Sequence, residues 1–241
     1  MNYIMLFEEF KEDEARELAK NAVKSMLKKT ETFALVGGSE SPKTLGIVLE
    51  TLNSKNVLVV TSATSYKADT ESKYSRILDD LGYISSFLHA SVKEEADSEE
   101  SLMKLEEADT VFFSGGDQSK ISDCLLGSVF LERLKEKVSK GTPVAGTSAG
   151  AVAMAENMIA GGKEEPRIGS GLAMLPSIIV DSHFDERKRI NRLEKAIKNF
   201  NNNIGLGISE DTAVIFKNGE ILLLGEGKVT VVTNSSSVKI N

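Results

Sequence analysis

Cysteine and histidine are scarce in this chain, which limits the metal and redox chemistry open to it. Its 241 residues include one cysteine, Cys124, and two histidines, His89 and His183. A single cysteine excludes an internal disulfide, and no Cys or His cluster has the spacing of a structural zinc site. We therefore expect Cys124 to be a small buried residue, and we expect no metal or cofactor.

Acidic residues outnumber basic ones, and the N-terminal apolar patch is short, which narrows the expected partners. Lysine and arginine total 29 against 36 aspartates and glutamates, a formal charge of -7. Such a chain is a poor general partner for nucleic acid or an anionic membrane. The opening MNYIMLFEEFKEDEAR reaches acidic residues after a short apolar patch and has no basic leader. We therefore expect neither a signal peptide nor a membrane span, and predict a cytoplasmic enzyme or binding protein.

What the chain does contain is a repeating order of strand, loop and helix. Apolar runs rich in β-branched or aromatic residues alternate with segments of helical spacing. This order is typical of an α/β protein with a mostly parallel sheet covered by helices on both faces. The length fits one domain over residues 1–241, with residues 1–30 as a helical extension. The predicted strands lie at 32–36, 56–62, 108–114 and 142–146.

Three further segments carry local signals. Residues 7–29 have the pattern of a charged amphipathic helix, which we expect to pack or to join two subunits. Ser41 and Pro42 suit a helix start, because serine can cap free amides and proline loses no hydrogen bond there. Asn218 and Gly219 lie between two apolar runs and tolerate positive φ. They predict a hairpin that extends the sheet with antiparallel strands near the C-terminus.

The segment Gly-Thr-Ser-Ala-Gly at residues 146–150 matches the G-x-S-x-G nucleophile elbow. Its small residues permit a strained turn from strand to helix that exposes the serine oxygen. The preceding residues have the pattern of a strand end, and AVAMAENMI at 151–159 that of the helix that follows. Two interpretations of Ser148 stay open: a reactive nucleophile, or a small residue in a turn where Gly146 and Gly150 let a helix approach the sheet.

A reactive serine needs a base and a group that orients that base. The base is usually histidine, and His89 and His183 both follow apolar runs. His183 has more polar residues near it in the sequence than His89 has. It also follows a predicted strand, and catalytic groups gather at strand ends in open α/β sheets. Glu210 and Asp211 follow the apolar run 204–208. Both are candidates for the orienting acid, although turn and cap acids are more common.

Backbone amides must also stabilise the oxyanion that forms during hydrolysis. The amide of Ala149, directly after the serine, can supply one hydrogen bond, and the loop with Gly115 and Gly116 can supply another. Such a glycine pair can equally be a phosphate loop or a plain turn. The segment LVGGSE at 35–40 is ambiguous in the same way. Because it lacks the frames of the usual nucleotide loops, nucleotide binding is a minor alternative.

Together, the segments FFSGGDQ, AGTSAGA, GLAMLPSIIVDSHFDERKRINRL and GLGISEDTAV resemble the cyanophycinase and aspartyl dipeptidase family of serine peptidases, family S51. The resemblance is strongest to cyanophycinases. It implies a flavodoxin-like fold similar to class I glutamine amidotransferases, and a homodimer. It also implies Ser148 as nucleophile, His183 as base and Glu210 as the orienting acid. The oxyanion donors that it implies are Gly116 and Ala149.

The same resemblance implies a substrate that carries both carboxylate and guanidinium groups. Cyanophycinases cut the polyaspartate backbone of cyanophycin, whose aspartates carry arginine, and release β-Asp-Arg dipeptides, whereas the dipeptidases remove an N-terminal aspartate. A pocket for such a substrate needs cations and anions, because each buried charge must be paired. The residues assigned to substrate binding, lining or supporting the pocket, are Asp117, Gln118, Asp181, Ser182, Arg187, Arg189 and Arg192.

These side chains cannot all meet one ligand. By helical spacing after His183, Arg187 is the best direct contact, whereas Arg189 is expected to be a partly buried strut paired to an acid. Arg192 is either a solvated charge or a site residue. Ser182 stands where cyanophycinases commonly have glutamine, which puts the polymer substrate in question but leaves hydrolysis untouched. Two alternatives stay open: an exopeptidase for short Asp-X or isoaspartyl peptides, and a catalytically silent protein that binds an aspartyl or arginyl ligand.

Overall fold

The computed structural model describes residues 17, 21, 28–200, 204–234 and 237–239. The amphipathic helix expected over residues 7–29, and with it the extension over residues 1–30, lies almost wholly outside the described residues. Within that described part, none of the helices combines the length and apolar character needed to cross a membrane.

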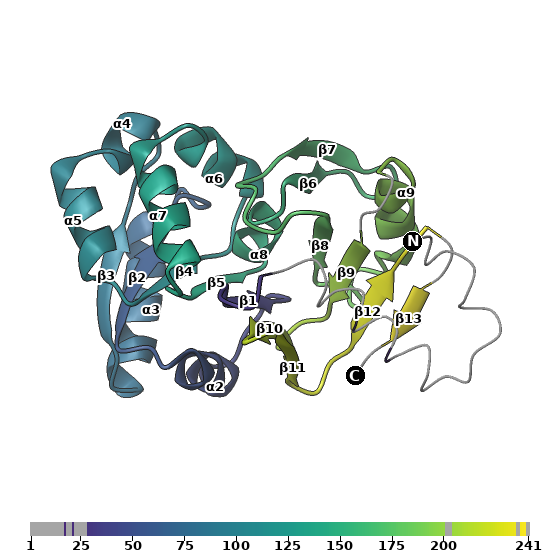
Figure 1. Cartoon of the computed structure of the whole chain (residues 1–241), viewed down its shortest axis with the longest axis horizontal. Helices are drawn as coiled ribbons and strands as arrows, with labels where there is room; N and C mark the ends of the chain where they lie inside the picture. The colour runs from purple at the N-terminus through teal and green to yellow at the C-terminus, as the bar shows by residue number, and fades with distance from the viewer. Residues whose placement is uncertain (1–16, 18–20, 22–27, 201–203, 235–236, 240–241) are drawn as a thin grey trace.

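The central sheet has seven strands in the order β11-β10-β1-β5-β4-β2-β3 (Figure 1). The five strands β1, β5, β4, β2 and β3 are parallel to one another. Beyond β1 the sheet continues with β10 and β11, which pair antiparallel. The four predicted strands and the antiparallel C-terminal extension are therefore confirmed. The bounds are β1 (Phe33–Val36), β2 (Asn56–Val60), β3 (Ile84–Leu88), β4 (Thr110–Phe113), β5 (Val144–Thr147), β10 (Ala213–Lys217) and β11 (Glu220–Leu224).

Helices cover both faces of this sheet because its strands are apolar on both sides. Along β1, Phe33 and Leu35 face one hydrophobic cluster, and Ala34 and Val36 face the other. The second cluster includes residues of α2 and α3, and the first includes residues of α5, α6 and α7. The α/β fold with a mostly parallel sheet is thus confirmed. The helix bounds are α2 (Pro42–Leu52), α3 (Lys67–Asp80), α4 (Lys93–Ala96), α5 (Glu99–Glu107), α6 (Gln118–Leu125) and α7 (Val129–Ser139).

The helix start and the hairpin turn that the sequence predicts are both present in the structure. The Ser41 side chain accepts a hydrogen bond from the Thr44 amide at 3.1 Å, and Pro42 is the first residue of α2. Asn218 and Gly219 have φ values of 55° and 76° in the turn between β10 and β11. Turn and cap chemistry therefore place these elements as predicted.

A second sheet departs from the single sheet that the sequence indicates. It has the order β13-β12-β9-β8 and lies beside the central sheet (Figure 1). Its own helix, α9, packs closely because β9 is rich in glycine: a Cβ on Gly205 would lie 2.8 Å from Leu193 Cγ. The bounds are β8 (Ile178–Ser182), β9 (Ile204–Ile208), β12 (Val229–Val232), β13 (Ser237–Lys239) and α9 (Ile190–Lys198).

The helix after Ser148 is shorter than predicted. α8 spans Ala149–Ala153, and Asn157–Gly161 form β6, which pairs antiparallel with β7 (Arg167–Ser170). Met158 and Ile159 are both buried but belong to different hydrophobic clusters. Neighbouring residues that face opposite sides are characteristic of a strand, so the apolar run has period two at its end.

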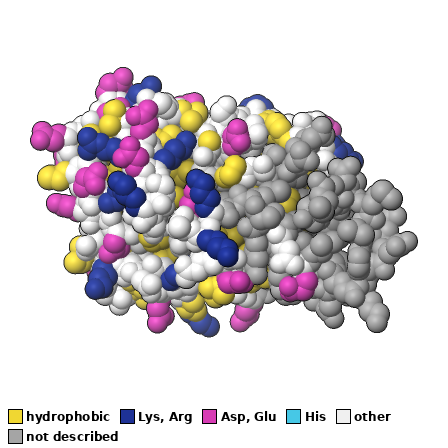
Figure 2. All heavy atoms as spheres, in the orientation of Figure 1, with side chains coloured by type: hydrophobic (Ala, Val, Ile, Leu, Met, Phe, Trp, Pro, Cys, Tyr) yellow, Lys and Arg dark blue, Asp and Glu magenta, His cyan; other side chains and the backbone are white. Residues whose placement is uncertain are grey.

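Charged side chains are mixed on the face that Figure 2 shows. Lysine and arginine are interspersed with aspartate and glutamate over the described part of this face. The mixture agrees with the modest formal charge of -7.

Candidate active site

The site forms where loops after several strands meet at one edge. In a parallel sheet the carboxyl ends of neighbouring strands lie at the same edge. Ser148 follows β5, and a glycine pair follows each of its neighbours β1 and β4. His183 follows β8 and Glu210 comes two residues after β9, which pair in parallel in the second sheet. The site therefore lies between the two sheets.

The elbow at Ser148 has a strained backbone and tight packing. Ser148 has φ 51° and ψ -113°, outside the regions that non-glycine residues ordinarily occupy. A Cβ on Gly150 would lie 2.2 Å from the carbonyl oxygen of Phe113, and one on Gly146 would lie 2.7 Å from the carbonyl carbon of Gly150. The glycines thus allow α8 to approach the sheet, as the packing interpretation of this motif expects. The strained serine makes it compatible with the catalytic interpretation as well.

Three side chains form a continuous line of hydrogen bonds. Ser148 Oγ lies 2.9 Å from His183 Nε2, and His183 Nδ1 lies 2.5 Å from Glu210 Oε1. The His183 side chain is only 11% exposed, whereas that of Glu210 is 35% exposed. If Nδ1 carries the proton and donates it to the carboxylate, Nε2 is free to accept the serine proton. This arrangement of alcohol, imidazole and carboxylate is the one that activates a serine nucleophile.

The two candidate acids differ in what they contact. The hydrogen bond from His183 lowers the pKa of the Glu210 carboxyl, and burial acts in the opposite direction. Asp211 instead accepts a hydrogen bond from the Ser41 amide at 2.7 Å. Of the pair, Glu210 is therefore the acid beside the imidazole, and Asp211 holds the loop before α2.

His89, the other histidine, belongs to a separate cluster. Its Nε2 lies 2.7 Å from Glu71 Oε2, and its Nδ1 lies 2.8 Å from Thr61 Oγ1. Thr61 is fully buried. Because both ring nitrogens have partners elsewhere, His89 is not positioned to take a proton from Ser148.

Of the expected oxyanion donors, Ala149 directly follows Ser148, and Gly116 is near the serine only through its neighbour Gly115. Ala149 is the first residue of α8, and the position of a Cβ on Gly115 would be 3.5 Å from Ser148 Cβ. Gly116 has φ 146°, and a Cβ there would lie 2.3 Å from the Ala63 carbonyl oxygen, so this position admits no side chain. Within the described residues, the amides of Ala149 and Gly116 donate to no protein acceptor. Both amides therefore remain candidates for stabilising an oxyanion.

Asp181, Arg189 and Arg192 form a cluster behind the site. Asp181 Oδ1 accepts a hydrogen bond from Arg189 Nη1 at 3.1 Å, and Oδ2 accepts one from Arg192 Nε at 2.9 Å. Arg189 also donates to the Ser182 carbonyl, and Arg192 to the Gly162 carbonyl, both at 2.6 Å. Burial raises the pKa of the Asp181 carboxyl, although the two arginines oppose this shift.

The burial of this cluster changes the expectation for several residues. Asp181, Ser182 and Arg192 are 1%, 3% and 7% exposed, and we place them behind the site as its support. The alternative of a solvated Arg192 is wrong because its guanidinium is buried against a carboxylate. Arg189 is a half-buried strut paired to Asp181.

The remaining expected substrate residues are more accessible. Arg187 is exposed in the turn after His183, which precedes α9 and does not belong to it. Asp117 is exposed and caps α6 by accepting a hydrogen bond from the Ser119 amide. Gln118 is half-buried and donates to the Ile159 carbonyl at 2.7 Å, which joins α6 to β6.

Sequence reasoning missed two residues of the loop after β1. A Cβ on Gly38 would lie 2.4 Å from Cε1 of the His183 ring, so this loop packs on the imidazole. The Glu40 carboxylate accepts a hydrogen bond from the Thr147 hydroxyl, directly before Ser148. The only signal in the sequence was the glycine pair in LVGGSE, which suggested a phosphate loop. Among the described residues no group of three or more His, Cys, Asp or Glu side chains could hold a metal ion.

Comparison with known proteins assigns the chain to a family. The model of peptidase family S51 matches residues 33–224, so this chain belongs to that family. Cyanophycinase from Trichormus variabilis (strain ATCC 29413 / PCC 7937) is 34% identical over 186 residues, which are 73% of this chain and 62% of the relative. Cyanophycinase from Synechococcus elongatus is 38% identical over 163 residues, 61% of this chain and 51% of the relative. The chain thus spans less than two thirds of the length of these curated relatives.

A solved structure has the same fold. The crystal structure of a peptidase from an acI-B1 Actinobacterium superposes with a TM-score of 0.71 at 22% identity. The match covers 87% of this chain and 96% of that one. At this identity the likeness concerns the fold alone.

Proposed function

We propose that this chain is a serine peptidase that hydrolyses aspartyl peptide bonds, with Ser148 as nucleophile, His183 as base and Glu210 as orienting acid. The observation that carries the proposal is the line of two hydrogen bonds, 2.9 Å from serine to imidazole and 2.5 Å from imidazole to carboxylate. Membership of family S51 and similarity to cyanophycinases support it. We also infer that the backbone amides of Gly116 and Ala149 stabilise the oxyanion.

The geometry suits an acyl-enzyme mechanism. Ser148 Oγ attacks the carbonyl carbon while its proton moves to His183 Nε2, and the oxyanion accepts hydrogen bonds from the amides of Ala149 and Gly116. The C–N bond then breaks as Nε2 returns the proton to the leaving amine. Water attacks the ester with His183 again as base, which releases the acid and restores the serine. Glu210 stabilises the imidazolium that forms in each half-reaction.

The substrate we propose is cyanophycin, with release of β-Asp-Arg dipeptides. The similarity to relatives named cyanophycinases supports this choice. Among the expected substrate residues, the two exposed charged ones fit a substrate with both kinds of charge: Arg187 is suited to a substrate carboxylate and Asp117 to a guanidinium. Because Arg189 and Arg192 each pair with Asp181, we do not assign these three residues to direct contact with the substrate.

The test begins with a fluorophosphonate, which labels an activated serine whatever the peptide substrate. We expect one label on Ser148 by peptide mass analysis, and no label in Ser148→Ala or His183→Ala. Cyanophycin and a panel of Asp-X and isoaspartyl dipeptides are then supplied separately, and the products are identified by mass. Dipeptides from the polymer support the proposal, whereas cleavage of short peptides alone indicates an exopeptidase. An unlabelled protein that is nevertheless stabilised by these ligands is a silent binder.

A further inference from the structure

The loop from Gly37 to Ser41 touches all three segments that carry the line of hydrogen bonds. The Gly37 carbonyl accepts a hydrogen bond from the His183 amide at 2.7 Å, and Gly38 packs against the imidazole ring. The Gly38 carbonyl accepts one from the Asp211 amide at 2.8 Å, directly after Glu210. The third contact is made by Glu40, through the residue before Ser148. We call residues 37–41 the bracket loop.

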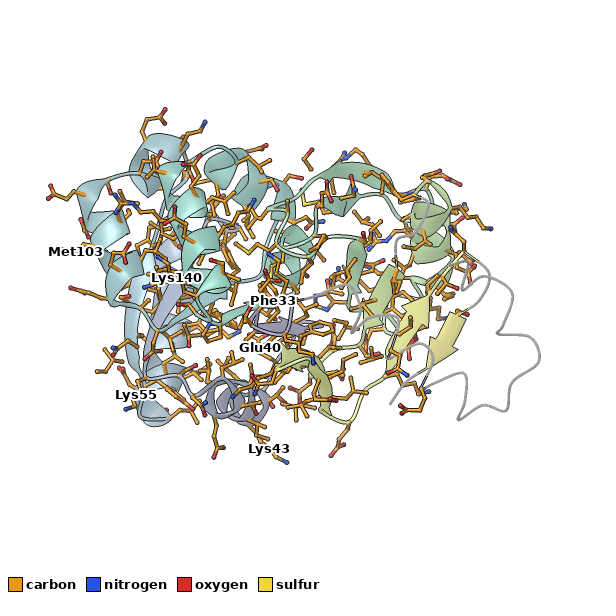
Figure 3. All side chains as sticks on the ribbon, in the orientation of Figure 1. Phe33, Glu40, Lys43, Lys55, Met103 and Lys140 are labelled. Carbon is orange, nitrogen blue, oxygen red and sulfur yellow. The ribbon has the colours of Figure 1, made fainter. Side chains whose placement is uncertain are left out.

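Glu40 is a buried acid in a network of donors. Its side chain is 4% exposed. Tyr74 OH donates to Oε1 at 2.7 Å, the Thr147 hydroxyl donates to Oε2, and Lys73 Nζ lies 3.4 Å from Oε1. Burial raises the pKa of Tyr74 well above its usual value, and the Glu40 charge adds to this shift. In Figure 3, Glu40 lies within the molecule near β1, whereas Lys43 points outward from α2.

The nucleophile elbow needs such support. A residue in the strained conformation of Ser148 costs about 1–3 kcal/mol and persists only where the surrounding structure fixes it. The Ser148 amide donates to the carbonyl of Val36, the residue directly before the bracket loop, at 2.9 Å. The Thr147 side chain is fixed by Glu40 at the end of the same loop. Val36 and the bracket loop therefore contact the chain at the Ser148 amide and directly before it, and the loop also packs on the imidazole.

We infer that Glu40 is a positioning residue, which through Thr147 and the bracket loop sets the geometry between the Ser148 hydroxyl and the His183 imidazole. The inference rests on the proposed function. It assigns Glu40 no contact with substrate, because its carboxylate is buried and bound by two hydroxyls and Lys73. A carboxylate that only stabilised the core would affect the fraction of folded protein and not the reactivity of the folded protein.

The experiment measures the rate at which a fluorophosphonate labels Ser148 in the full chain, with kinact and KI determined separately and far-UV circular dichroism reporting the folded fraction. Thr147→Val removes the hydroxyl but keeps the shape, and Thr147→Ser keeps the hydroxyl. Glu40→Gln removes the charge, and it is combined with Thr147→Val. Asp109→Asn is the matched control, because that carboxylate binds the amides of Lys55 and Asn56 at the opposite end of the sheet, both at 3.0 Å.

We expect Thr147→Val and Glu40→Gln to lower kinact by about tenfold to a hundredfold with KI unchanged, since small misplacements of reacting groups have effects of this size. Thr147→Ser restores the rate, and the double variant loses no more than the slower single variant, because both break one interaction. Asp109→Asn destabilises the fold and labels like the wild type.

The inference is overturned if Thr147→Val labels within about twofold of the wild type, or if the two losses multiply as independent effects do. If Thr147→Val does not fold, Glu40→Gln decides by the same limits. A wild-type protein that is not labelled at Ser148 refutes the proposed function, and the inference falls with it. If the wild type is labelled at Ser148 while Thr147→Val and Glu40→Gln are labelled slowly, the proposed function and the inference are both supported.

Discussion

Replacing the buried carboxylate of Asp181 tests whether the ion pairs behind the site stabilise the fold. Asp181 is 1% exposed and is the counter-ion of both Arg192 and Arg189, whose side chains are 8% and 16% exposed. Asp181→Asn keeps the shape and one acceptor oxygen but removes the charge. Two guanidiniums then share a buried site without a counter-ion, which is the costly case for buried ion pairs.

The magnitude follows from this geometry. Breaking a buried ion pair costs about 3–5 kcal/mol, and the acceptor that asparagine retains puts Asp181→Asn near the lower end. For a chain of this length each kcal/mol corresponds to about 2–4 °C in Tm, so we expect a loss of about 6–12 °C. Arg192→Met should cost less, because Asp181 keeps its ion pair with Arg189.

Urea unfolding followed by far-UV circular dichroism measures both variants against the wild type. A fall of less than about 1 kcal/mol in the free energy of unfolding for Asp181→Asn, with an unchanged m value, would show that the arginines do not depend on this carboxylate. If stability is kept while KM for an aspartyl peptide rises, Asp181 contacts substrate and our placement of it behind the site is wrong.

Three other predictions follow from the packing and titration of single residues. Gly150→Ala should destabilise the protein by about 1–3 kcal/mol in thermal unfolding, because the new Cβ meets the rigid Phe113 carbonyl. Cys124 is fully buried and burial raises its pKa, so a thiol reagent at neutral pH should modify it only after unfolding in guanidinium. Because the pKa of Glu210 is lowered in the folded protein, its contribution to stability is complete above about pH 4.5 and is lost as pH falls through the lower folded value. Glu210→Gln should remove that acid-range dependence from the unfolding free energy, and should slow labelling of Ser148 by about 10²–10⁴-fold.

Elements that depend on local chemistry could be predicted from the sequence. The strand β9 begins and ends where the apolar run 204–208 does, and the hairpin turns at Asn218 and Gly219. The cap at Ser41 forms with the predicted side chain. Periodicity and turn preference act over a few residues, so each signal is complete within its own segment.

Elements that depend on distant partners were predicted less well. The end of AVAMAENMI forms strand β6 because β7, ten residues further along the chain, supplies its hydrogen-bonding partner. The sequence also could not separate β8 and β9 from the central sheet. Strand runs are similar whichever sheet they join, and only pairing decides between the sheets.

The same distinction applies within the candidate site. Ser148 and His183 could be proposed because their residue types and strand-end positions carry the chemistry. The choice between Glu210 and Asp211 required the resemblance, since adjacent acids share one local environment in the sequence and differ only in which distant group each one reaches.

Glu40 shows this limit most clearly. It directly precedes the capping residue of α2, where an acid is favourable in any helix, so its local sequence suggests only a helix start. Its hydroxyl partners are 34 and 107 residues away, at Tyr74 and Thr147. The reactive residues can therefore be recognised in the sequence from their residue types. Residues that hold them in place can be recognised only from their contacts in the structure. For this reason the rate of serine labelling in Glu40 and Thr147 variants tests what the fold adds beyond the motifs.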